Sequence, residues 1–218
     1  MKQINNILQQ IEEIERQVKE VYEKKGICTE LWNLTEQIPI LKRELSLLRQ
    51  QETAVLLEDW QYMWDVGAPI PHVFSNGYEL FLIYYLAQND PKWDGTYVNV
   101  IDINSSASHS IALITFEHVV HHAFGAPNDE VINGHPLYEH GLEAHTAHEI
   151  IHSSQISKLE KINAVHSCYA PDYWKKLKHY AFTFHDEMFE CIARGYKAEV
   201  FNTSFKEVVF MATERLFK

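Results

Sequence analysis

The first 48 residues carry two apolar stripes at heptad spacing, and this pattern restricts the start of the chain to paired helices. The first stripe steps by three and four through Ile4, Ile7, Ile11, Ile14, Val18 and Val21. Lys24-Lys25-Gly26 marks a helix end, and the second stripe follows at Leu31, Leu34, Ile38, Leu41, Leu45 and Leu48. We therefore predict a coiled-coil-like antiparallel helical hairpin over residues 1–57, with Pro39 kinking or splitting its second helix.

The two stripes leave two arrangements open. They can pack against each other within one chain, or they can pack between chains. Ile or Val at both seam positions of the first helix is the pattern that favours assemblies of more than two strands. We expect residues 1–57 to form a homo-oligomer.

Beyond Leu57 the composition becomes aromatic and turn-rich, which predicts a domain boundary at residue 58 and a second domain over residues 58–218. Strand patterns occupy residues 78–86, 96–103, 111–119, 180–184 and 189–193. Helical patterns occupy residues 142–165 and 171–178, and Ser204-x-x-Glu207 is a capping box that opens a last helix. The predicted fold class is α+β, with an antiparallel sheet of about five strands packed with helices.

Residues 134–152 hold five of the chain's thirteen histidines and end in His148-Glu149-x-x-His152. On a helix the two imidazoles lie one turn apart and can bind zinc, with Glu149 as the general base of a hydrolase. A third ligand at a familiar spacing is missing, and the apolar stripe centred on Ile151 leaves these histidines at a boundary where solvated histidines are common. A zinc-dependent hydrolase is therefore the alternative hypothesis.

The hairpin expected over residues 180–193 suggests a second group. A turn centred on Asp186-Glu187 places one set of side chains on the core face: Phe182, Phe184, Phe189 and Cys191, with Phe184 opposite Phe189. His185 and Glu190 become diagonal neighbours on the other face, where they can hold a polar ligand or move protons. The alternative is a solvated sheet face with a structural turn aspartate at Asp186.

A long loop over residues 125–141 contains the turn signal Pro127-Asn128-Asp129, and loops of this length are often functional. His135 lies in this loop and can approach the same face of the hairpin. The candidate ligand-binding residues are therefore His135, His185, Asp186 and Glu190.

A set of short motifs resembles a family of uncharacterised bacterial proteins with no assigned activity. They are Trp64-Asp65-x-Gly67-Ala68-Pro69, Trp93-Asp94-Gly95-Thr96, Phe124-Gly125-x-Pro127-Asn128-Asp129-Glu130, Gly134-His135-Pro136-Leu137 and Phe184-His185-Asp186-Glu187-x-Phe189-Glu190-Cys191. The resemblance covers residues 60–200 only, so the helical hairpin lies outside it. It implies that the position of His152 is often Asn, which makes His148-Glu149-x-x-His152 a local variant.

The net charge of −11 lies almost wholly after residue 57 and argues against nucleic acid or an anionic membrane as a partner. Three cysteines without a C-x-x-C pair indicate reduced thiols, and no signal-peptide or membrane-spanning run is present, so we expect a cytoplasmic protein. The favoured hypothesis is a non-catalytic oligomeric protein, without a cofactor, whose acidic domain binds a protein partner or small ligand. Zinc at His148 and His152, with Glu149 catalytic, belongs to the alternative.

Overall fold

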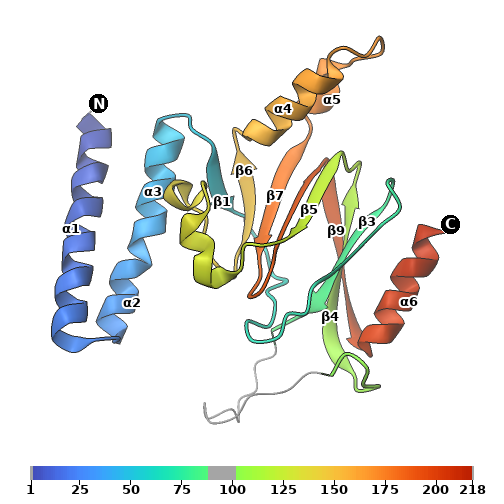
Figure 1. Ribbon diagram of the computed structural model, residues 1–218, viewed down its shortest axis with the longest axis horizontal. Coiled ribbons are helices and arrows are strands. Elements are labelled where there is room, and N and C mark those ends of the chain that lie inside the picture. Colours follow the sequence, from blue (N-terminus) through green and yellow to red (C-terminus); the bar gives the residue numbers. More distant parts are fainter. Residues whose placement is uncertain (1, 88–101, 218) are drawn as a thin grey trace.

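The computed structural model describes residues 2–87 and 102–217 (Figure 1). These residues form an α+β fold with a long N-terminal helix and two antiparallel sheets, of five and four strands. The predicted α+β class is confirmed, whereas the single sheet of about five strands is wrong because there are two sheets. In the described part of the chain, no helix has the length and apolar character needed to cross a bilayer.

The N-terminal helices, which we call the arm (residues 2–48), are α1 (Lys2–Lys25), α2 (Thr29–Thr35) and α3 (Gln37–Leu48). In Figure 1, α1 lies beside α2 and α3, and a small apolar cluster of Ile7, Ile11 and Leu45 is buried between α1 and α3. The break between α2 and α3 falls at Glu36, three residues before Pro39, so the second helix is split near the proline as predicted. Other seam residues of α1 stay half-buried: Ile14, Val18 and Val21.

The five-stranded sheet has the order β1 (Thr53–Leu56), β6 (Ala147–Ile151), β7 (Lys178–Thr183), β8 (Met188–Ala193) and β5 (His121–Gly125), with every neighbouring pair antiparallel. Its edge strand β1 comes from the segment assigned to the helical hairpin. The helices end at Leu48, so the predicted boundary at residue 58 falls after a strand that belongs to the sheet.

Residues 142–165, predicted to be helical, are corrected by the structure to β6, a turn at His152 and the helix α4 (Ser154–Asn163). The apolar residues of this segment fit a helical stripe, but β6 is paired with β1 on one side and with β7 on the other. These tertiary pairings outweigh the local pattern, which is common for short strands. α4 begins where Ser153 Oγ accepts a hydrogen bond from the Ile156 N–H.

The four-stranded sheet has the order β2 (His72–Ser75), β3 (Leu80–Tyr85), β4 (His109–Glu117) and β9 (Gly195–Thr203). The strands predicted at 78–86 and 111–119 are confirmed as β3 and β4. Of the strand predicted at 96–103, residues 96–101 lie outside the described residues. The last helix, α6 (Phe205–Leu216), follows the predicted capping box and covers the outer face of this sheet. Its buried contacts there are made by Phe205, Val208 and Ala212.

The two sheets share one core of large aromatic side chains, which include Trp64, Tyr84, Phe116, Phe182, Phe184 and Phe189. Edge-to-face pairs bridge the sheets, such as Phe116 from β4 with Phe182 from β7 at 6.0 Å between ring centroids. The prediction that Phe182, Phe184, Phe189 and Cys191 share the core face is confirmed, since all four are fully buried.

Two short 3-10 helices, η1 (Asp129–Gly134) and η2 (Tyr138–His140), cover the other face of the five-stranded sheet, and α5 (Pro171–Trp174) follows α4 (Figure 1). Ile132, Leu137 and Leu142 pack there against Ala181 and Met188 of β7 and β8. This packing holds the start of η1 close to the turn that joins β7 to β8.

Candidate metal centre

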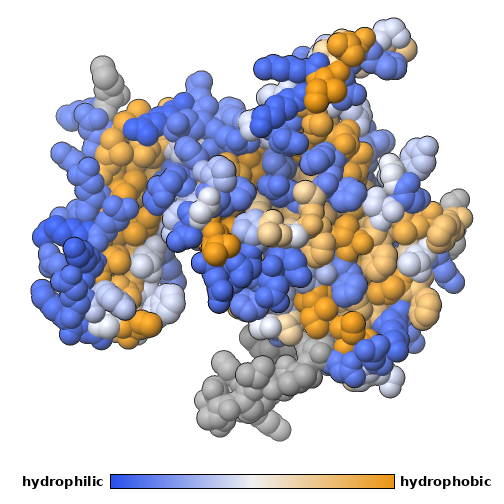
Figure 2. Space-filling view, viewed as in Figure 1, coloured by the Kyte–Doolittle hydropathy of each residue, from blue (hydrophilic) through white to orange (hydrophobic). Residues whose placement is uncertain are grey.

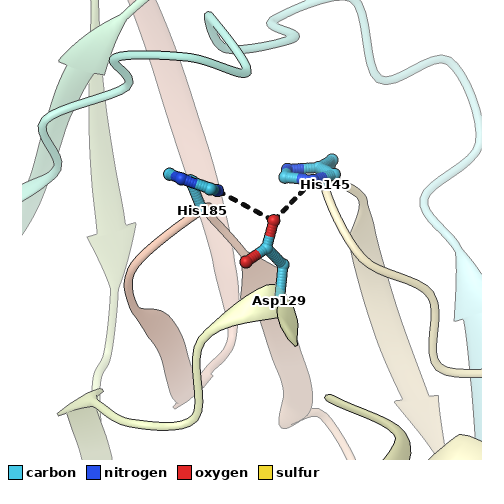
Figure 3. Close-up of side chains that lie close together, drawn as sticks. All are labelled: Asp129, His145 and His185. Atoms are coloured by element: carbon cyan, nitrogen blue, oxygen red, sulfur yellow. Dashed lines mark hydrogen bonds and ion pairs between the residues drawn. The ribbon is translucent and has the colours of Figure 1, made fainter. Parts of the chain in front are cut away.

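Three segments that are distant in sequence bring one carboxylate and two imidazoles together (Figure 3). Asp129 is the first residue of η1, His145 lies in the connection before β6, and His185 lies in the turn between β7 and β8. Asp129 Oδ2 is 3.0 Å from His145 Nε2 and 2.8 Å from His185 Nδ1. The three atoms lie within 4.8 Å of one another.

Other hydrogen bonds hold these segments in place independently of the three side chains. The Asp129 N–H donates to the His185 carbonyl at 3.0 Å, which joins η1 to the hairpin turn. Thr183, at the end of β7, accepts a hydrogen bond from the Thr146 N–H at 3.0 Å and donates its hydroxyl to the Glu143 carbonyl at 2.7 Å. The segment that carries His145 is therefore fixed to the strand that leads to His185.

The hydrophobic core also supports the turn between β7 and β8. The Phe184 N–H donates to the Glu187 carbonyl at 2.8 Å and closes the turn around His185. The Phe184 ring packs against Trp64 with 4.5 Å between ring centroids. The position of His185 thus depends on a buried neighbour as well as on its own contacts.

The electrostatics of the group favour a charged carboxylate. Burial alone would raise the pKa of the Asp129 carboxyl, but the hydrogen bond from His185 and the nearby charges of His185 and His145 outweigh it, so this pKa is lowered. The same hydrogen bond and the negative charge of Asp129 raise the pKa of His185. Asp129 Oδ1 and His145 Nδ1 are both buried without a hydrogen-bond partner within residues 2–87 and 102–217.

Two imidazole nitrogens and one carboxylate oxygen are a ligand set that zinc and other divalent transition metals accept. The side chain of Asp129 is 16% exposed and that of His185 is 43% exposed, so one side of the group faces solvent. Three protein ligands leave at least one coordination position for water or another ligand. Among the residues that the structure describes, this is the one group with such geometry.

The predicted zinc motif is not such a group, because His148-Glu149-x-x-His152 lies on β6 and the following turn rather than on a helix. Successive residues of a strand face opposite sides of the sheet, so His148 and Glu149 point away from each other. Four residues of strand span roughly 13 Å, against about 6 Å on a helix. The structure therefore contradicts the proposed ligand pair.

His148, Glu149 and His152 each make contacts that differ from those of a zinc site. His148 is fully buried, not solvated as predicted, and burial lowers its pKa to about 3. Its Nε2 accepts a hydrogen bond from the Glu143 N–H at 3.3 Å. Glu149 forms an ion pair with Lys178 at 2.8 Å, and His152 is an exposed turn residue with φ of 56°.

The hairpin register also differs from the prediction. Phe189 lies opposite Phe182 rather than Phe184, because the turn centres on His185-Asp186, one residue earlier than predicted. Moving the turn by one residue shifts the pairing by two, which keeps every side chain on its predicted face.

The predicted pair of His185 and Glu190 is wrong as a consequence. Glu190 lies opposite Ala181, and its carboxylate is 3.6 Å from Nε2 of His179. Burial lowers the pKa of His179 to about 4 and raises that of Glu190, so His179 is neutral near pH 7.

Of the four predicted ligand-binding residues, only His185 belongs to the group. His135 directly follows η1, and its Nδ1 accepts a hydrogen bond from the Leu137 N–H at 3.1 Å. Asp186 is exposed in the hairpin turn, where its charge adds to the raised pKa of His185.

Asp129 and His145 were not predicted as site residues. The available signal was the long loop of residues 125–141, whose Pro127-Asn128-Asp129 turn contains the carboxylate.

No protein-family model, curated protein or solved structure matches this chain. The resemblance to a bacterial family therefore stays a prediction.

Proposed function

We propose that this protein binds one divalent transition-metal ion through Asp129, His145 and His185. The observation that carries the proposal is the convergence of three ligand atoms from three separate segments within 4.8 Å. Imidazole nitrogens suit zinc and its neighbours in the first transition row, whereas calcium and magnesium prefer sets of oxygen ligands. Zinc replaces the protons that the rings share with Asp129, so binding releases protons.

In this proposal the ion is the small ligand of a binding protein. The favoured hypothesis from the sequence had no metal or cofactor, so the proposal departs from it on this point. The open coordination position supports hydrolysis as a second candidate function, since a zinc ion with three protein ligands can hold a reactive water. This second candidate is again a zinc-dependent hydrolase, but its metal ligands are Asp129, His145 and His185 instead of His148 and His152. Glu149 has no role in it, because this carboxylate pairs with Lys178 on another strand.

Isothermal titration of chelator-stripped protein with zinc tests the proposal. We expect one site per chain, and His185→Ala should weaken its affinity roughly 100-fold, equivalent to about 2.7 kcal/mol. His152→Asn is the matched control, because it removes an exposed histidine that lies outside the group. Affinity unchanged in His185→Ala, or lost in His152→Asn, contradicts the proposed centre.

We also propose, as predicted from the heptad stripes, that the arm joins copies of this chain into a homo-oligomer. Large apolar side chains on α2 and α3 face solvent, with Trp32 60% and Ile40 56% exposed. Figure 2 shows hydrophobic surface along the arm. A groove of about 410 Å³ runs between α1 and α3 beside Ile14, Ile40 and Leu41. The occupant that we propose for this groove is the arm of a second copy, which carries the same exposed apolar side chains.

Light scattering on the full chain tests this assembly. Ile40→Glu places a charge in the groove and should reduce the mass to that of a monomer. Asn33→Glu adds the same charge at an exposed polar position of α2 and should leave the mass unchanged. A monomeric wild-type protein would refute the assembly without affecting the metal centre.

A further inference from the structure

Residues 129–145, which we call the bridging segment, begin and end with two of the three candidate ligands, Asp129 and His145. Between these ends lie η2 and the residues that hold α3 of the arm. One continuous piece of chain therefore connects the metal centre to the arm.

The contacts of this segment with α3 are mainly polar. Lys42 Nζ is 2.8 Å from Glu139 Oε1, and Ser46 Oγ is 2.9 Å from His140 Nδ1. Lys42 is nearly buried, and its ammonium also lies over the Tyr138 ring at 4.8 Å from the centroid. Lys42 and Ser46 lose their water on this side of α3, whereas Glu139 stays largely exposed, so the contacts depend on where the segment places its polar groups.

Arg43 completes the attachment of α3. Its guanidinium donates to the Gly141 carbonyl at 3.1 Å and to the Ala54 carbonyl at 2.9 Å, and it forms an ion pair with Glu143. Gly141 has φ of 91°, and a Cβ there would meet the Ala54 carbonyl oxygen at 2.8 Å. The segment can approach α3 and β1 this closely only with glycine at this position.

One oxygen of Asp129 contacts both imidazoles, and Asp129 Oδ1 and His145 Nδ1 have no partners among the described residues. A metal ion bound to all three side chains would join both ends of the bridging segment to the hairpin turn. Closing the segment in this way removes conformations in which its middle moves away from the arm.

We infer that metal binding at Asp129, His145 and His185 strengthens the docking of α3 onto the sheet, through the bridging segment. The inference rests on the proposed metal centre and adds its regulation: the ion controls how firmly the arm is held. Linkage makes the effect reciprocal, so a loosened arm lowers the affinity for the metal by the same factor.

Hydrogen exchange measured by mass spectrometry on the full chain, with and without zinc, tests the inference. Zinc should slow exchange in residues 37–48 by at least about 5-fold, the lower range of typical coupling between sites. The same addition to His185→Ala should leave exchange in these residues unchanged, because the variant lacks one metal ligand and His185 lies in the turn between β7 and β8, outside the bridging segment.

The converse experiment measures zinc affinity in Lys42→Met. This variant removes the ion pair with Glu139 and leaves an apolar side chain at position 42. We expect its zinc affinity to fall about 5-fold, whereas Lys175→Met, which removes a surface ion pair with Asp172, should have no effect. If zinc binds without altering exchange in residues 37–48, this inference is overturned and the metal centre stands. If zinc does not bind, both fail.

Discussion

Two groups of residues that include histidines differ in how closeness in sequence relates to closeness in the structure. His148 and His152 are close in sequence and form a familiar zinc spacing, yet β6 and its turn separate them and bury only the first. Asp129 and His185 are 56 residues apart, yet their side chains meet at 2.8 Å beside His145. The difference teaches that a spacing motif is informative only together with the secondary structure that it assumes.

The position of His185 depends on the turn between β7 and β8. The largest expected effect on stability therefore comes from removing the buried side chain that supports this turn. Phe184 is 1% exposed and packs against Trp64 and Tyr84. Phe184→Ala should lower the free energy of unfolding by about 3–5 kcal/mol, as large-to-small changes in cores do.

Urea denaturation measures this change, with Phe124→Ala as the matched control, because Phe124 is 42% exposed at the edge strand β5. The control should cost less than about 1 kcal/mol. Equal losses in both variants would mean that the turn is not supported by the core.

The motif histidines themselves provide the second prediction. His148→Ala should lower the free energy of unfolding by about 1–3 kcal/mol, because it empties a buried position and the partly buried Glu143 N–H loses its acceptor. His152→Asn should change it by less than about 0.5 kcal/mol, since Asn tolerates the left-handed conformation of this exposed turn.

Thermal or chemical unfolding in the presence of chelator measures both variants. If His152→Asn proved as costly as His148→Ala, the two residues would have similar environments, and the separation described here would be wrong.

The third prediction concerns pH and has the smallest effect, because His185 is partly exposed. Asp129 raises the pKa of His185 above its ordinary value of 6.5 in the metal-free protein. The stability from this pair is therefore fully present below about pH 6.5 and is lost as the pH rises through the raised pKa. Buried His148 has the opposite sign: its pKa is lowered to about 3, so its contribution is lost as the pH falls below about 6.5.

Unfolding of metal-free wild type and His185→Gln between about pH 5 and pH 8 separates the two contributions. The wild type should exceed the variant in stability at the acidic end and equal it at the basic end. A difference that grows with rising pH would contradict the hydrogen bond between His185 and Asp129.

Elements with long, regular patterns could be predicted from the sequence. The apolar run of β3, the capping box of α6 and the core face of the β7–β8 hairpin are confirmed, because local chemistry and burial favour the same structure. The strand β6 could not be predicted, since its five residues gain their pairing from β1 and β7, which are distant in sequence.

The candidate metal centre was predictable only in part. His185 was singled out from the hairpin pattern, and the loop around Asp129 was recognised as long and turn-rich. Their meeting depends on the packing of η1 over β7 and β8 and on Thr183, which fixes the segment that carries His145. Such contacts follow from the complete fold and have no signature within a single stretch of sequence.

The most direct test is a crystal structure of the full chain with zinc, in which anomalous diffraction at the zinc edge locates the ion. The result expected is one strong peak with Asp129 Oδ2, His145 Nε2 and His185 Nδ1 all at about 2.0–2.2 Å. A peak between His148 and His152, or no peak at the three residues under saturating zinc, would contradict the account.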